Sequence, residues 1–138
     1  MPKRLGSLYF YWMKFILLLP LFVAAASCSA QNLDPDCLAR IRKGVFVPEQ
    51  AGPMEVIRTG KEYVEVYNEG DAKLFHAIRW DNDSTFTLTM KRSVNVLTCL
   101  KKGEIMKTTI TTCQGNRYES KSISLYCGDT EESFVKRK

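Results

Sequence analysis

The sequence of 138 residues contains a single histidine, His76, and this scarcity excludes most histidine-based chemistry. Metal sites and Cys-His nucleophile pairs need several ligating or basic side chains close together. The chain also lacks a G-x-S-x-G nucleophile turn, a glycine-rich phosphate loop and a C-x-x-C pair. We therefore expect no catalytic residue, no cofactor and no metal, and we interpret His76 as packed on, or at the rim of, an apolar sheet face.

Acidic side chains are absent from residues 1–30, where the charged residues are Lys3, Arg4 and Lys14. An apolar run from Phe15 to Ala26 follows, and small residues come after it. A basic start, a short apolar run and small residues are typical of a secretory signal peptide. A membrane span needs about 20 apolar residues, and Lys14 interrupts the longer run. We expect 1–30 to direct export and 31–138 to form a single β domain.

The end of this signal allows two modes of processing. Ala25-Ala26-Ser27-Cys28 resembles a bacterial lipobox, in which Cys28 would be lipidated. The alternative is cleavage after Ala30 by an ordinary signal peptidase. Translation starting at Met13 is also compatible with the pattern, since Met13-Lys14 opens a natural signal. The expected location is the outer membrane as a lipoprotein, the periplasm or the extracellular space, with membrane contact only through the lipid.

The excess of positive charge belongs to this first segment. The whole chain carries a formal charge of +5. Removing Lys3, Arg4 and Lys14 leaves seventeen basic residues against fifteen acidic ones, a formal charge of +2. A nearly neutral domain gives no indication of a nucleic-acid-binding surface.

The cysteines support export. If Cys28 is lipidated or removed, an even set remains, which is Cys37, Cys99, Cys113 and Cys127. An even number in a small exported domain predicts disulfides, because the periplasm and the exterior are oxidising.

After residue 31 the pattern predicts one short helix followed by strands. Asp34 suits a helix N-cap, Pro35 the first helical position and Gly44 the stop. Short runs of β-branched and aromatic residues, separated by turn residues, predict strands. These are 45–47, 54–59, 63–67, 74–80, 85–91, 104–113 and 117–127, with 93–102 either a short helix or an irregular crossover. The fold class is therefore all-β, an antiparallel meander forming a strongly curved sheet or a small lipocalin-like barrel.

The last two strands allow a register. A two-residue turn at Gly115-Asn116 pairs Cys113 with Tyr118. The more apolar face then carries Met106, Thr108, Ile110, Thr112, Glu119, Lys121, Ile123, Leu125 and Cys127, and we expect this face to meet the core. Cys113 and Cys127 point to opposite faces, so they should not bond to each other. The preferred pair is Cys99–Cys127.

Carboxylates are interpreted as solvated. Glu62, Glu65 and Glu69 alternate with aromatic and aliphatic residues, and solvated strand faces explain them better than a paired-carboxylate glycosidase site. Asp81-Asn82-Asp83 begins like a calcium loop but lacks the glycine and glutamate that complete one, so we interpret it as a turn.

Short motifs along the chain carry a resemblance. They are Cys37 before Gly44-Val45-Phe46, then Ile57-Arg58, Trp80–Leu88 and Gln114–Tyr118. In order and spacing they are similar to a family of small exported bacterial proteins of unassigned function, some labelled automatically as DNA topoisomerase IV. The family has cysteine and tyrosine where Ser84 and Phe86 stand here, so its pattern provides no partner for Cys37 in this strand. That label does not fit, because a type II topoisomerase needs large DNA-gate and ATPase domains. The resemblance implies an all-β envelope protein and supplies no catalytic residues.

Three classes of function remain open. The first is a non-enzymatic envelope or secreted module that binds or scaffolds an unknown partner. The second is a carrier of a small apolar ligand in a lipocalin-like barrel. The candidate ligand-lining residues are His76, Trp80, Phe86, Leu88, Met90, Ile110 and Ile123. The third is a small hydrolase that uses His76.

Overall fold

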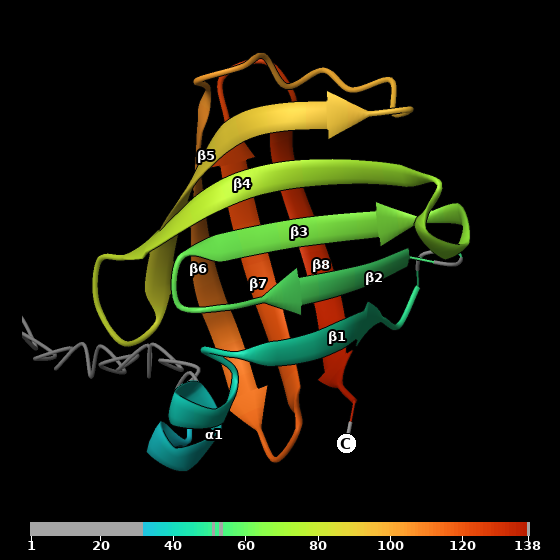
Figure 1. Ribbon diagram of the computed structural model, residues 1–138. Coiled ribbons are helices and arrows are strands. Elements are labelled where there is room, and N and C mark those ends of the chain that lie inside the picture. The colour runs from blue at the N-terminus through green and yellow to red at the C-terminus, as the bar shows by residue number, and fades with distance from the viewer. Residues whose placement is uncertain (1–31, 51, 53, 138) are drawn as a thin grey trace, which may run out of the picture.

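The structure is a computed structural model that describes residues 32–50, 52 and 54–137 (Figure 1). These residues form eight strands and one short α-helix, α1 (Pro35–Arg40). The strands are β1 (Gly44–Pro48), β2 (Met54–Arg58), β3 (Glu62–Tyr67), β4 (Ala72–Trp80), β5 (Thr85–Val94), β6 (Ile105–Gln114), β7 (Arg117–Ser124) and β8 (Gly128–Lys136). A single 3-10 turn, η1 (Asn68–Gly70), links β3 to β4.

The helix α1 begins where the sequence predicts it. The Asp34 side chain accepts a hydrogen bond from the Asp36 backbone N–H at 3.0 Å, and Pro35 occupies the first turn, where its missing N–H is not needed. Cys37 and Leu38 are the buried residues of the helix. They carry the apolar side of α1 onto one end of the strands.

The strands form an antiparallel meander that closes on itself. Each strand pairs with its neighbours in sequence, and β1 also pairs with β8, so the sheet is a closed barrel. In Figure 1, strands β1–β4 run across the front of the molecule and cross β6–β8 behind them, while β5 curves from one set to the other. The all-β prediction is confirmed, and the barrel is the form that the sheet takes.

The strand that closes the barrel, β8, is absent from the sequence prediction. Its residues Asp129, Glu131, Glu132 and Ser133 are poor strand formers, so propensity gives no signal there. Antiparallel pairing with β7 along the whole strand overrides that preference. The pairing of β8 with β1 covers only Phe134–Lys136, so the first part of β8 has no partner on that side.

A β-bulge changes the predicted faces of the β6–β7 hairpin. Near the turn the register is as predicted, with Cys113 opposite Tyr118. The register then shifts between Ile110 and Thr112, because one extra residue on β6 is accommodated. Ile110 and Cys113 both face inward as a result, and Ile110 lies opposite Ser120.

The predicted core face of β7 is therefore wrong. The buried residues of this strand are Tyr118, Ser120, Ser122 and Ser124, which the sequence assigned to the outer side. Ile123 is 52% exposed on the outside, and Leu125, beyond the end of β7, is 82% exposed. With the bulge in β6, the side chains of Ser120, Ser122 and Ser124 face the inside of the barrel.

The two ends of the barrel differ. At the closed end, α1 packs on β6, and Cys37 is bonded to Cys113. At the opposite end, which we call the mouth, the irregular segment 95–104 connects β5 to β6, and Cys99 is bonded to Cys127. The Cys99–Cys127 pair and the absence of a Cys113–Cys127 bond are as predicted.

The signal peptide, the Met13 start and the lipidation of Cys28 all lie outside the described residues. Within the described ranges, no helix has the length and hydropathy that crossing a membrane requires.

Candidate functional site

A buried arginine organises the closed end. Arg58, at the end of β2, is 2% exposed. Its Nη1 donates to the carbonyl of Ile41 at 2.6 Å, and its Nη2 donates to the hydroxyl of Tyr118 at 2.7 Å. The guanidinium carbon lies 4.7 Å from the ring centre of Phe46 and 4.9 Å from that of Phe86.

Aromatic rings replace a carboxylate as the partners of this charge. The rings of Tyr63 and Tyr118 also lie about the guanidinium, each with its centre 5.3 Å from the Arg58 guanidinium carbon. Such faces attract cations electrostatically, and more strongly when water is excluded. Among the described residues Arg58 forms no ion pair within 4.0 Å. It is therefore a structural cation that holds the closed end together.

A cavity of about 250 Å³ lies between these rings and the mouth. Three rings that surround Arg58, those of Tyr63, Phe86 and Tyr118, also line this cavity. The remaining lining residues are Glu65, Tyr67, Leu74, Thr98, Cys99, Leu100, Met106, Thr108, Ser120, Ser122, Cys127, Thr130 and Glu132. Hydroxyl and carboxylate groups share this lining with apolar side chains, among them Leu74, Leu100 and Met106, so the cavity has both polar and apolar surface.

The carboxylate of Glu65 is the most enclosed charge of the cavity. Its side chain is 13% exposed, and its Oε2 accepts a hydrogen bond from the hydroxyl of Tyr67. Its Oε1 lies 3.4 Å from Nε2 of His76, which is itself buried. Nε2 has no hydrogen-bond partner. Glu65 is thus held in place by one donor and faces a ring nitrogen whose hydrogen-bonding capacity is unused.

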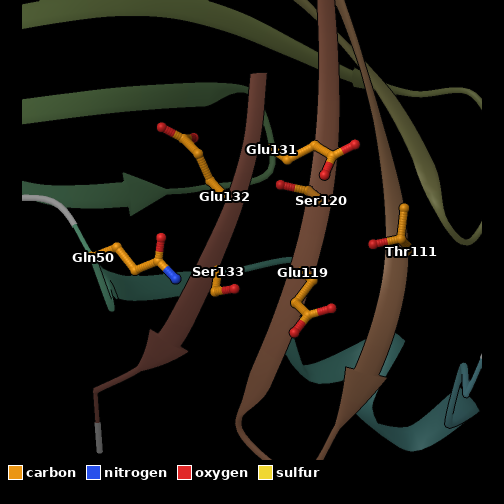
Figure 2. Close-up of a pocket in the computed structure, with 7 residues that line it drawn as sticks. All are labelled: Gln50, Thr111, Glu119, Ser120, Glu131, Glu132 and Ser133. Atoms are coloured by element: carbon orange, nitrogen blue, oxygen red, sulfur yellow. The ribbon is translucent and has the colours of Figure 1, made fainter. Parts of the chain in front are cut away.

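Glu132 supplies the second carboxylate. Its residue lies opposite Ser120, which is buried, so both point toward the barrel interior. Figure 2 shows the side chains of Glu131 and Glu132 leaving β8 on opposite sides. Glu132 is exposed, because it lies in the part of β8 that β1 does not cover. Its carboxylate has no ion pair among the described residues.

The titratable groups of the cavity influence one another. Burial, followed by the charge of Glu65, raises the pKa of Glu132 above its ordinary range. Burial, followed by the Glu65 charge and hydrogen bond, raises the pKa of Tyr67. Burial is also the first cause of the raised pKa values of Tyr63 and Tyr118. The tyrosines therefore stay protonated at neutral pH. The hydroxyl of Tyr67 donates to Glu65, and that of Tyr118 accepts from Arg58.

A second hollow, whose lining residues are drawn in Figure 2, lies beside β7 and β8. It is lined by Gln50, Thr111, Glu119, Ser120, Glu131, Glu132 and Ser133. Its outward carboxylates already have basic partners: Glu131 lies 3.7 Å from Lys121, and Glu119 lies 3.4 Å from Arg117. The uncompensated carboxylate of this groove is Glu132, which also belongs to the cavity.

The sequence-derived lining residues divide into three groups. Phe86 lines the cavity. His76, Leu88, Met90 and Ile110 are buried inside the barrel without lining it, and Trp80 is partly buried against Phe86, with ring centres 4.8 Å apart. Ile123 is a correction, because the bulge in β6 places it on the outer surface.

Three side chains of the site are missing from the sequence prediction. Alternation along 54–58 places Arg58 on the face of Met54 and Val56, and alternation along 63–67 places Glu65 between Tyr63 and Tyr67. That period-two signal could have found both residues. The interpretation of Glu65 as solvated is wrong, whereas Glu62 and Glu69 are exposed as expected. Glu132 had no signal, since its strand was not predicted.

The remaining chemistry of the cavity is limited by its residue types. The four cysteines 37, 99, 113 and 127 are all in disulfides, so none of them offers a free thiol to His76. In the described part of the chain, no cluster of three or more His, Cys, Asp or Glu side chains is arranged to hold a metal ion. The groups that the cavity offers to a ligand are carboxylate acceptors, tyrosine and serine hydroxyls, and aromatic surface.

A scan of protein-family models, a search of curated proteins and a search of solved structures each found no match to this chain. The resemblance to the small exported bacterial family therefore remains a prediction from the sequence motifs.

Proposed function

We propose that this protein is an exported, non-enzymatic binding module that holds a small polar molecule in the cavity of its barrel. The single observation that carries the proposal is the cavity itself, about 250 Å³ of space inside a closed barrel. Eight-stranded barrels with such an interior hold one small ligand. This volume lies below the range of about 300–1,000 Å³ that is usual for ligand pockets, so the ligand is small.

The lining favours a polar ligand over the apolar one considered from the sequence. An apolar molecule would exclude water from the enclosed carboxylate of Glu65, which keeps the Tyr67 hydroxyl as a donor to Oε2, and would leave its Oε1 without a new donor. Desolvating a charge that is incompletely hydrogen-bonded is unfavourable. The hydroxyl of Ser120 would lose hydrogen-bonding water in the same way, whereas that of Ser122 already bonds to Thr108 at 2.9 Å.

Export is supported by the two disulfides, Cys37–Cys113 and Cys99–Cys127. Disulfides persist in oxidising compartments and are rare in the reducing cytosol. A non-enzymatic role is supported by the surroundings of His76, whose Nε2 faces Glu65 rather than a hydroxyl or a thiol. The proposal of export does not include lipidation of Cys28.

The test is ligand-observed NMR of the oxidised chain against a mixture of small cationic, neutral and anionic metabolites. A matched variant, Ser122→Phe, fills the cavity, while Ser133→Phe adds the same ring at a partly exposed position of β8 that does not line it. We expect at least one ligand signal that Ser122→Phe abolishes and Ser133→Phe retains. Equal signals in all three proteins, or none in any, would contradict a cavity ligand.

A further inference from the structure

The charged side chains that line the cavity are both acidic. Its lining contains the carboxylates of Glu65 and Glu132 and no lysine, arginine or histidine. The nearest basic group in the core, Arg58, lies on the other side of the rings of Tyr63, Phe86 and Tyr118 and donates to Ile41 and Tyr118 instead. A ligand entering this space therefore meets negative charge first.

The two carboxylates act on one another without an intervening cation. Repulsion from Glu65 is a cause, after burial, of the raised pKa of Glu132. Glu65 is enclosed and Glu132 is exposed, but both line the same cavity, so their like charges repel, and a positive group between them relieves that repulsion.

His76 provides an independent indication at the same place. Its side chain is 1% exposed, its Nε2 has no hydrogen-bond partner, and that atom lies 3.4 Å from Oε1 of Glu65. His76 does not line the cavity, and its Nε2 forms no hydrogen bond with Oε1 of Glu65. Among the described residues Oε1 therefore has no hydrogen-bond donor and can accept an N–H bond from a ligand.

Aromatic surface completes the environment of a cation. The ring of Tyr67 belongs to the lining and lies outside the group that surrounds Arg58. A desolvated cation gains from such a ring as well as from carboxylates.

We propose that the ligand of the cavity is a small organic ammonium, whose charged nitrogen lies between Glu65 and Glu132. The inference rests on the proposed function and names its ligand class. An anionic ligand would add to the existing repulsion, and a neutral one would leave it unrelieved. The small volume restricts the organic part to a few carbon atoms or one ring.

The test compares three nearly isosteric probes by isothermal titration calorimetry on the oxidised chain. They are 2-phenylethylammonium, 2-phenylethanol and phenylacetate. We expect the ammonium to bind at least about tenfold more tightly than the alcohol, because it adds charge-assisted hydrogen bonds, and phenylacetate to give no measurable heat.

The variants Glu65→Gln and Glu132→Gln keep the shape of the site and remove one charge each. We expect either to weaken binding of the ammonium about tenfold or more. Glu131→Gln is the matched control, since Glu131 is adjacent in sequence but points outward, with a side chain that is 78% exposed. It should bind like the natural chain.

The outcomes separate this inference from the proposed function. Tighter binding of phenylacetate or 2-phenylethanol, lost in Ser122→Phe, would overturn the ammonium and leave a cavity ligand in place. An ammonium that binds equally to the Glu65, Glu132 and Glu131 variants would also overturn it. The absence of binding by all three probes would overturn the ammonium, and the broader metabolite mixture then decides the cavity.

Discussion

The closed end and the mouth of this barrel solve the same problem, that of charge inside a small protein, in opposite ways. At the closed end one cation, Arg58, is surrounded by rings and by two hydrogen-bond acceptors. Toward the mouth two anions, Glu65 and Glu132, share a space that contains no cation from the described chain. In the first arrangement both terminal nitrogens of Arg58 have acceptors, and Nε is left without one. In the second, we propose that a ligand supplies the missing cation.

We infer from this difference that the closed end contributes mainly to stability and the mouth to binding. A closely packed end whose cation has two hydrogen-bond acceptors can hold the barrel together. An end with two carboxylates and no lysine or arginine retains the capacity to bind at the expense of stability. Substitutions at the closed end should therefore lower the free energy of unfolding, and substitutions that remove charge toward the mouth should leave it unchanged or raise it.

The largest expected effect comes from the disulfides. Cys37 and Cys113 are separated by 76 residues, and Cys99 and Cys127 by 28. The chain-entropy relation gives about 4.5 kcal/mol for the first bond and about 3.6 kcal/mol for the second. Paired replacement by serine should therefore destabilise the closed end more, as measured by urea unfolding of the two double variants. A larger loss of unfolding free energy on removal of Cys99–Cys127 would contradict the greater structural role of the closed end.

The next effect concerns Arg58. Arg58→Met keeps much of the volume but leaves the carbonyl of Ile41 and the hydroxyl of Tyr118 without their donor. Unsatisfied buried groups cost about 1–3 kcal/mol each, so we expect a loss of about 3 kcal/mol in urea unfolding.

Arg79→Met is the matched control for Arg58. Arg79 lies 3.1 Å from Asp81, but its side chain is 77% exposed. Exposed ion pairs contribute about 0–1 kcal/mol. Equal losses in the two variants would show that Arg58 has no special role at the closed end.

The smallest expected effect is a pH-dependent change in the free energy of unfolding when Glu132 is replaced. The pKa of Glu132 in the folded chain lies above its ordinary value of 4.5, so its charge opposes folding at neutral pH. Its contribution favours folding below pH 4.5 and is lost as the pH rises through the folded-state pKa. Glu132→Gln should therefore be more stable than the natural chain at pH 7, by less than about 1 kcal/mol because Glu132 reaches solvent.

That advantage should disappear toward pH 4.5, and urea unfolding at the two pH values measures it. Glu131→Gln, on the outer side of the same strand, should show no such change in its stability difference. A Glu132→Gln variant that is less stable at pH 7 would mean that the carboxylate has a favourable partner.

The parts of this fold that follow local rules could be predicted from the sequence. The helix start at Asp34-Pro35 and the alternation of Phe86, Leu88 and Met90 are local, and both are as expected. The Cys99–Cys127 bond also follows, because both cysteines were placed near the crossover between strands.

The parts of the fold that depend on pairing between distant strands could not be predicted from the sequence. The bulge in β6 adds one residue and reverses which face of β7 is buried, an outcome that no local pattern around Ile123 contains. The acidic strand β8 forms because β7 and β1 offer it partners. Since Glu132 belongs to that strand, half of the charged pair in the cavity was beyond sequence reasoning.

Both described ends of the chain leave the barrel on the same side. Asp34 donates its backbone N–H to Cys113, and Arg137 donates its own to Val45, both at the closed end. Immobilising the protein through either end should therefore leave the mouth directed outward, so that a surface-bound layer could exchange ligand freely. The same orientation would suit a biosensor made by attachment at residue 32 or 137.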